Sequence, residues 1–333
     1  MHTLPSIFVL YTGGTIGMSQ SRQGLRPDAA LAGKALLPFV GRFRFDWHLC
    51  DPLIDSSAVT LADWQSWLQL VAEKIPQYNG VLVLHGTDTL AYAANLFALA
   101  LQGLDKPVVL TGSQLPYDAE NSDAPLNLAT AVAAFELDLR ETVIAFNGKL
   151  FPAVGSSKTS TESAEGFSNP HFGTLAQWSP EQGWDNVRIR PSEKTGQALQ
   201  VRPLNPQAKV ICTTLIPGFA AQACSDGLGR SGADAVVLQS YGHGNAPADA
   251  GFIDAVRRFT AKGGLLLNIS QVPQGNAAAV YAQGSALRGA GVVNGGKANL
   301  ETAAVLLTLA VGSGWTAGRL QQELLDLGLV EEA

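Results

Sequence analysis

Short runs of apolar and β-branched residues, bounded by turn residues, recur along the first half of the chain. They occupy residues 7–11, 80–84, 108–111 and 142–146. Runs that are apolar throughout and only a few residues long are typical of strands buried on both faces of a parallel sheet. We therefore expect these segments to be buried parallel strands.

Between these runs the apolar residues follow the spacing of amphipathic helices. The clearest case is 61–75, whose apolar face is formed by Trp64, Trp67, Leu68, Val71 and Ile75. Thr60 and Asp63 resemble a capping box at its start. Further helices are expected from about 88 to a stop at Gly103, and over about 126–133. Strands that alternate with helices predict an α/β fold, with a parallel or mixed sheet flanked by helices.

The pattern changes over about 179–207, where Pro, Gly, Asn and charged residues follow neither the helical nor the strand periodicity. We expect an N-terminal α/β domain over 1–185, a linker over 186–208 and a smaller C-terminal α/β domain over 209–333. In the last of these, strands are predicted at 210–215, 235–239 and 264–269. Helices are predicted there at 249–261, 300–311 and 316–327.

Composition narrows the classes of function. The 333 residues carry a formal net charge of −6 and are 46% hydrophobic, without a cluster of Lys and Arg, so nucleic acid is not an expected partner. No apolar stretch is long enough to span a membrane. The three cysteines lack the spacing of a disulfide framework or a metal site. The start of the chain looks like a first strand, not a signal peptide, so we expect a cytoplasmic protein.

Candidate chemistry appears where the predicted strands end. Open parallel sheets bind ligands at the carboxyl ends of their strands. The first strand is followed by TGGT, in which two glycines permit a tight turn that leaves the Thr15 hydroxyl facing a cleft. A plain strand-to-loop turn is the alternative.

A second predicted strand ends in HGTDT, which places Thr87 and Asp88 at the start of a helix. They could simply cap that helix. The repetition favours a site, because two strands end in Gly-Thr and a third, at 108–111, leads into Gly-Ser.

A hydroxyl needs a neighbouring proton acceptor before it can act as a nucleophile. Lys158, in SSKTSTES, is the candidate, and a solvated loop lysine is the alternative. Asp55, Ser56 and Ser57 would add a carboxylate and two hydroxyls to the same rim, unless they form an ordinary turn.

Taken together, these motifs resemble the bacterial-type L-asparaginases, and most of all the cytoplasmic type I branch. The resemblance runs from about residue 6 to the C-terminus, in the expected order. It rests on YTGGTIGM at 11–18, DSS at 55–57, HGTDTLAY at 85–92, TGSQLP at 111–116, the lysine in SSKTSTES, and YGHGNAP at 241–247.

The resemblance implies an L-asparagine amidohydrolase that makes L-aspartate and ammonia through an acyl-enzyme, as a homodimer or homotetramer without metal or cofactor. Thr15 would be the nucleophile. Thr87, Asp88 and Lys158 would form a second group that activates water. Asp55, Ser56, Ser57 and Asp88 would bind the substrate, and Asn245 would reach a site from a partner subunit.

One position departs from the family pattern. Members usually carry a tyrosine on the loop after the first strand, and its phenol assists the nucleophilic threonine. Here Leu25 occupies that place. Leucine cannot relay a proton, so Tyr117 or a water would have to replace the phenol, or turnover would be reduced.

Three alternatives follow. A dual asparaginase-glutaminase remains open, since one methylene changes binding by only roughly 1 to 3 kcal/mol. A weakly active or non-catalytic amino-acid-binding homologue is favoured only by Leu25. A dinucleotide-binding oxidoreductase is disfavoured, because TGGTIG lacks the G-x-G-x-x-G spacing.

Overall fold

The computed structural model describes residues 4–21, 24–189, 198–278 and 282–331. The chain divides into two compact units, Met1–Val201 and Arg202–Ala333. The predicted architecture, a larger sheet with flanking helices followed by a smaller α/β part, is confirmed. The predicted domain limits, with a linker over 186–208, stay a prediction.

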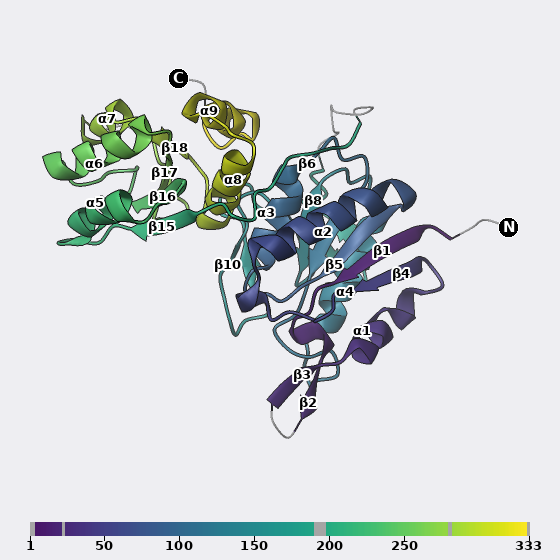
Figure 1. The fold of residues 1–333 in the computed structure, drawn as a ribbon. Coiled ribbons are helices and arrows are strands. Elements are labelled where there is room, and N and C mark those ends of the chain that lie inside the picture. Colours follow the sequence, from purple (N-terminus) through teal and green to yellow (C-terminus); the bar gives the residue numbers. More distant parts are fainter. Residues whose placement is uncertain (1–3, 22–23, 190–197, 279–281, 332–333) are drawn as a thin grey trace. The chain divides into compact units, whose positions relative to one another are not determined.

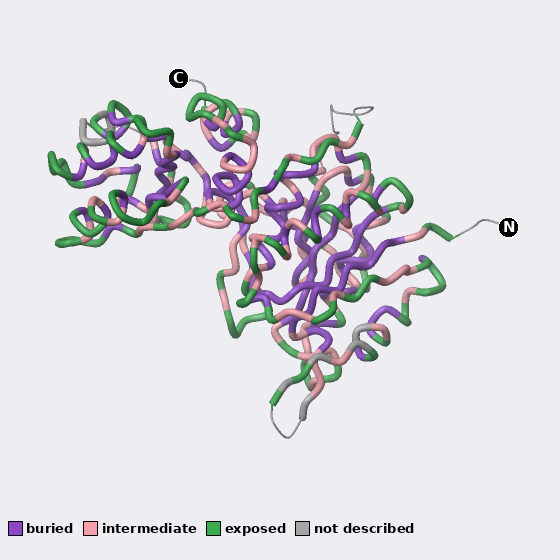
Figure 2. Tube along the Cα trace, in the orientation of Figure 1, coloured by how far each residue is buried: buried purple, intermediate pink, exposed green. Residues whose placement is uncertain are grey.

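The first unit is built on an eight-stranded sheet. From one edge to the other, its strands are β13 (Gly183–Asp185), β12 (Ala176–Ser179), β9 (Lys149–Pro152), β8 (Thr142–Phe146), β7 (Val108–Thr111), β5 (Gly80–Leu84), β1 (Ser6–Tyr11) and β4 (Arg44–Leu49). The five from β8 to β4 are parallel to one another, and β9, β12 and β13 each pair antiparallel with their neighbours. The four runs identified in the sequence are the central strands, and every residue of β5, β7 and β8 is buried (Figure 2).

Helices cover both faces of this sheet (Figure 1). Helices α1 (Ala29–Leu36) and α4 (Ala124–Ala133) share one apolar cluster with the side chains of Val9 and Leu82. Helices α2 (Leu61–Lys74) and α3 (Leu90–Ala100) contact each other on the other side. The sequence therefore predicted α2, α3 and α4 to within a few residues.

The capping box at the start of α2 is confirmed. The Thr60 hydroxyl accepts from the Asp63 backbone N–H at 3.3 Å, and the Asp63 carboxylate accepts from the Thr60 N–H at 2.8 Å. Reciprocal bonds of this kind satisfy two N–H groups that the helix itself leaves unpaired.

Short antiparallel pairs complete the unit. They are β2 (Met18–Ser21) with β3 (Gly24–Pro27), β10 (Ser157–Lys158) with β11 (Phe167–Ser168), and β6 (Leu101–Gln102) with β14 (Gln200–Val201). None of these was predicted, because the two-residue strands carry no readable period and the four-residue strands β2 and β3 lack an apolar run.

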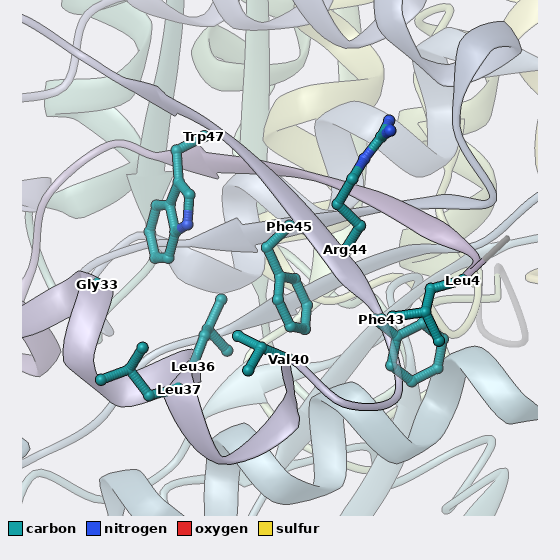
Figure 3. A pocket seen from close by; sticks show the side chains of 9 residues that line it. All are labelled: Leu4, Gly33, Leu36, Leu37, Val40, Phe43, Arg44, Phe45 and Trp47. Carbon is teal, nitrogen blue, oxygen red and sulfur yellow. The ribbon is translucent and has the colours of Figure 1, made fainter.

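An apolar hollow of about 510 Å³ lies where edge strand β4 faces α1 and the turn after it. Phe43, Phe45 and Trp47 alternate along one face of the chain there and supply the aromatic lining. In Figure 3, Arg44 points away from the apolar side chains. The lining contains none of the candidate catalytic residues.

The second unit is a four-stranded parallel sheet in the order β15 (Val210–Thr214), β16 (Ala235–Ser240), β17 (Leu265–Ser270) and β18 (Val293–Asn294). Its helices are α5 (Ala220–Arg230), α6 (Ala250–Ala261), α7 (Ala282–Gly289), α8 (Leu300–Gly312) and α9 (Ala317–Asp326). Three of these strands and helices α6, α8 and α9 were predicted. Among the described residues, no helix is long and apolar enough to cross a membrane.

A buried ion cluster fastens α9 to the start of this unit. Arg202 forms a bidentate pair with Glu323 at 2.7 and 2.8 Å, and Arg319 adds a bond at 2.7 Å. Both guanidinium groups lie 5.0 Å from the ring centre of Trp315. Glu323 is only 3% exposed, so its charge is balanced almost entirely by these arginines.

Replacing Glu323 with alanine should destabilise the protein. The change leaves Arg202 without its carboxylate partner in a buried site, which typically costs about 3 kcal/mol. Glu331→Ala is the control, because its carboxylate is 85% exposed and lies 3.6 Å from Lys297, so its loss should cost less than about 1 kcal/mol. Urea unfolding measures both. Equal shifts of the midpoints would contradict the role of the cluster.

Candidate active site

Most candidate residues of the first unit follow three neighbouring strands, β4, β1 and β5, and Lys158 lies in β10. Thr15 begins a 3-10 turn four residues after β1, and Thr87 and Asp88 lie between β5 and α3. Asp55 caps a second 3-10 turn, Ser56–Ala58, in the segment after β4. Because the strands are parallel, all three segments emerge at the same edge of the sheet.

The backbones of these segments are in direct contact. Thr12 donates from its N–H to Leu84 O at 3.0 Å and accepts at its carbonyl from Ile54 N–H at 2.8 Å. A Cβ added to Gly14, whose φ is +101°, would lie 2.5 Å from the N of Gly86. Thr15 and Thr87 each directly follow one of these two touching glycines.

Gly86 also faces the third segment. A Cβ at this position would lie 2.5 Å from Ser56 Oγ. Ser56 is 4% exposed, so the segment after β4 is pressed against the turn after β5. Glycine is therefore required by space here and by both space and backbone conformation at Gly14.

Thr87, Asp88 and Lys158 are brought together by the fold. Lys158 Nζ lies 2.8 Å from Thr87 Oγ1 and 2.7 Å from Asp88 Oδ1. The Lys158 side chain is only 16% exposed, so it is not a solvated loop lysine. Helix α3 begins at Leu90 with Thr89 at its N-cap, so Thr87 and Asp88 are not its caps either. A buried hydroxyl thus contacts an ammonium, whose charge is balanced by a half-exposed carboxylate.

Gln114 also joins this group, although it is not among the site residues predicted from the sequence. Its Oε1 lies 3.5 Å from Thr87 Oγ1, a long contact, while its Nε2 donates to Ser160 O at 2.8 Å. The Asp123 carboxylate accepts from the Gln114 backbone N–H. Its position after β7, the next strand along the sheet, is the signal that would have identified it.

Asp55 and Ser57 form a local pair at the rim. Asp55 Oδ1 accepts from the backbone N–H and from the hydroxyl of Ser57, both at 2.9 Å. These two bonds, the backbone bond first, hold the pKa of Asp55 below its usual range. Asp55 therefore keeps a negative charge on the exposed side of the segment.

Three further residues named from the sequence are Asn245, Leu25 and Tyr117. Asn245 belongs to the second unit, in the turn after β16, where its backbone N–H and carbonyl both bond to the backbone of Tyr241.

Leu25 lies in β3, in register with Gln20 of β2. Asp28 N–H donates to Gly17 O at 2.7 Å, so the β2–β3 hairpin returns to the turn that carries Thr15. Tyr117 approaches the same turn through its N–H, 3.3 Å from Ile16 O.

His85 occupies the floor beneath these segments. It is 2% exposed, its Nδ1 lies 2.6 Å from Thr12 Oγ1, and its Nε2 lies 3.0 Å from Thr89 Oγ1. The indole of Trp67 packs edge-on against the ring at 5.4 Å. Burial lowers the pKa of His85 to about 4. The imidazole is therefore neutral at physiological pH.

No group of three His, Cys, Asp or Glu side chains suited to a metal ion occurs within 4–21, 24–189, 198–278 and 282–331. The polar groups gathered at Thr87 are its own hydroxyl, an ammonium, an amide and one carboxylate.

Comparison with known proteins agrees with this fold and motif set. Residues 6–190 match the family model described as asparaginase, N-terminal, and residues 209–324 match the glutaminase/asparaginase C-terminal domain. The chain is 34% identical over 305 residues to L-asparaginase 1 of Escherichia coli K12, covering 89% of this chain and 88% of that protein.

Solved structures show the same similarity. L-asparaginase I from Vibrio cholerae superposes with a TM-score of 0.87 at 28% identity, covering 97% of each chain. The thermostable L-asparaginase from Thermococcus kodakarensis gives a TM-score of 0.87 at 25% identity, covering 98% of this chain and 100% of that one. The fold and strand-end motifs are those of amide-hydrolysing enzymes of the L-asparaginase type. The chain belongs to the asparaginase family.

The neutral state of His85 predicts a loss of stability in acid. In the unfolded chain its pKa returns to about 6.5, so protons bind the unfolded state preferentially. Above pH 6.5 His85 is neutral in both states and does not lower the free energy of unfolding. Below pH 6.5 the unfolded state takes up the proton first, so the free energy of unfolding falls, by about 3 kcal/mol at pH 4. Urea midpoints between pH 7 and 4 measure this loss.

His85→Gln, which has no titratable group at this position, is the comparison. Its stability should fall less steeply over the same pH range. Parallel pH profiles for the two proteins would contradict the assignment of a neutral, buried His85.

Proposed function

We propose that the protein hydrolyses L-asparagine to L-aspartate and ammonia, with Thr15 as the nucleophile. The observation that carries the proposal is the contact of the Lys158 ammonium with Thr87 and Asp88, next to the turn that presents Thr15. The names of the similar proteins support the same reaction.

The chemistry divides into two steps. Thr15 Oγ attacks the side-chain amide carbon, the proton of its hydroxyl passes to the amide nitrogen, ammonia leaves, and an ester to Thr15 remains. Water then opens the ester and releases aspartate. Thr87 positions that water, whose proton passes through Thr87 to Lys158 in its neutral form and returns to Thr15 Oγ as the ester opens, while Asp88 balances the charge of the ammonium that forms. Backbone N–H groups of the glycine turns would stabilise the developing oxyanion.

Binding of the substrate head group follows from the rim. Ser56 and Ser57 would hold the α-carboxylate, and to do so the Ser57 hydroxyl and N–H would have to exchange their bonds to Asp55 for bonds to the substrate. The side chain of Asp88 contacts Lys158 and is still 60% exposed, so its carboxylate can also bind the α-ammonium. The negative charge of Asp55 would also attract the ammonium end, which sets the direction in which the zwitterion enters.

Assembly and location are part of the proposal. We infer a homodimer or homotetramer in which Asn245 reaches the site of a neighbouring subunit, acting in the cytoplasm without metal or organic cofactor. One structurally similar protein, from Campylobacter jejuni, is named as a probable cytoplasmic L-asparaginase.

Thr87→Val should reduce kcat for L-asparagine by about 10³-fold, because it removes the hydroxyl that would activate water while preserving the side-chain volume. Thr142→Val is the matched control, since the Thr142 hydroxyl is buried without a hydrogen-bond partner. Its kcat should be unchanged. Ammonia release from L-asparagine and, separately, from L-glutamine measures both variants.

An active Thr87→Val variant would refute the two-threonine mechanism. A wild type that releases ammonia from glutamine as fast as from asparagine would establish a dual enzyme. Release from neither amide would favour a binding protein.

Leu25→Tyr should raise kcat by about tenfold if the missing phenol limits the attack by Thr15, since proton transfer by a positioned side chain contributes at least that much. Leu25→Phe is the control, because it adds the ring without the hydroxyl. The same ammonia assay applies. Equal kcat values for the two variants would show that a phenol at position 25 does not limit turnover.

A further inference from the structure

A chain of side-chain contacts crosses the floor of the site and ends at a backbone carbonyl on each side. It runs from Leu84 O to Thr12 Oγ1 (3.1 Å), then to His85 Nδ1 (2.6 Å), from His85 Nε2 to Thr89 Oγ1 (3.0 Å), and finally to Ser56 O (2.9 Å). Each link lies within hydrogen-bonding distance. The chain thus connects the segments that follow β1, β5 and β4.

The available hydrogens are one fewer than the contacts. Thr12 and Thr89 each supply one hydroxyl hydrogen, and a neutral imidazole supplies one N–H, whereas the terminal carbonyls can only accept. An imidazolium would satisfy every contact, but burial keeps His85 neutral, as its pKa of about 4 indicates. One of the four contacts therefore carries no hydrogen, and its position fixes the tautomer of His85.

The contact between Thr12 and Leu84 can be lost at the least cost. Leu84 O already accepts from the backbone N–H of Thr12 at 3.0 Å, so it stays paired without the hydroxyl. This contact is also the longest of the four, at 3.1 Å. The Thr12 hydroxyl then donates to His85 Nδ1, and the ring proton resides on Nε2.

The direction of the remaining bonds follows. His85 Nε2–H donates to Thr89 Oγ1, which leaves the Thr89 hydroxyl hydrogen free to point at Ser56 O. Trp67, packed edge-on against the imidazole, restricts its rotation. The orientation of the Ser56 peptide is thus set from β5 through two side chains.

We propose that His85, as the Nε2–H tautomer, is a positioning residue that acts through Thr89 to hold Ser56 and Ser57 in the geometry that binds the substrate carboxylate. This inference rests on the proposed function, in which those serines grip the α-carboxylate. His85 touches neither the reacting amide nor Thr15 in this scheme, so its influence falls on binding more than on the chemical step.

Thr89→Val tests the link, because it removes the hydroxyl and keeps the shape. An unpaired buried N–H and a lost bond to Ser56 O should raise KM for L-asparagine, and the Kd for the product L-aspartate, by about tenfold. The value of kcat should change less than about threefold. Thr89→Ser, which restores the hydroxyl, should recover both constants, and Thr142→Val should leave them unchanged.

Two substitutions of His85 distinguish the roles of the two ring nitrogens. His85→Gln can place an N–H near the position of Nε2, whereas His85→Asn reaches only the position of Nδ1. Gln should therefore retain a lower KM than Asn. Equal values for KM and Kd in Thr89→Val and wild type, or an Asn variant that binds as well as Gln, would overturn the proposal.

The tautomer is measured without turnover. Two-bond ¹H–¹⁵N spectra of the imidazoles at pH 7, with His85 identified by its absence from the His85→Gln spectrum, should show a protonated Nε2 and a bare Nδ1. A proton on Nδ1 would overturn the inference alone, whatever the activity. Absence of ammonia release by a wild type with the expected tautomer would instead reject the proposed function.

Discussion

The close approach of three strand-end segments is the constraint on which the site depends. Gly14 lies against Gly86, and Gly86 lies against Ser56, at separations that no other residue permits. A larger residue would separate the threonines that follow the two glycines. Such a displacement would lower the catalytic rate, because a shift of about 1 Å at a catalytic centre can reduce the rate by about 10²-fold.

The charged side chains at the strand ends lie near the surface, and the buried groups beneath them are neutral. Lys158 is largely buried and needs a counter-charge, which Asp88 supplies while remaining half exposed. His85, deeper in the floor, is neutral. The fold thus keeps ionic groups near the rim and neutral hydrogen-bonding groups beneath them, where an uncompensated charge would be costly.

Strands β5, β7 and β8 were predictable to the residue, because they are apolar and bounded by turn residues. Helices α2 and α4 were predictable from their periodicity. The pairing of Lys158 with Thr87 was expected only from the family resemblance and not from any local pattern, since 71 residues separate them and only tertiary structure brings them together. Gln114 and the contacts of His85 were missed for the same reason. The β2–β3 hairpin lacks a clear apolar repeat, and α5 was missed because its buried positions are only Ala221, Cys224 and Leu228, in a helix that contains two glycines.

The ion cluster of the second unit has a consequence for biosynthesis. Arg202 opens that unit, and its partner Glu323 lies in the last helix, α9. During translation Arg202 therefore emerges long before Glu323, its partner in α9, whereas the parallel strands of the first unit are already complete. The first unit can fold while the second is still being synthesised, so the ribosome delivers the chain in two stages.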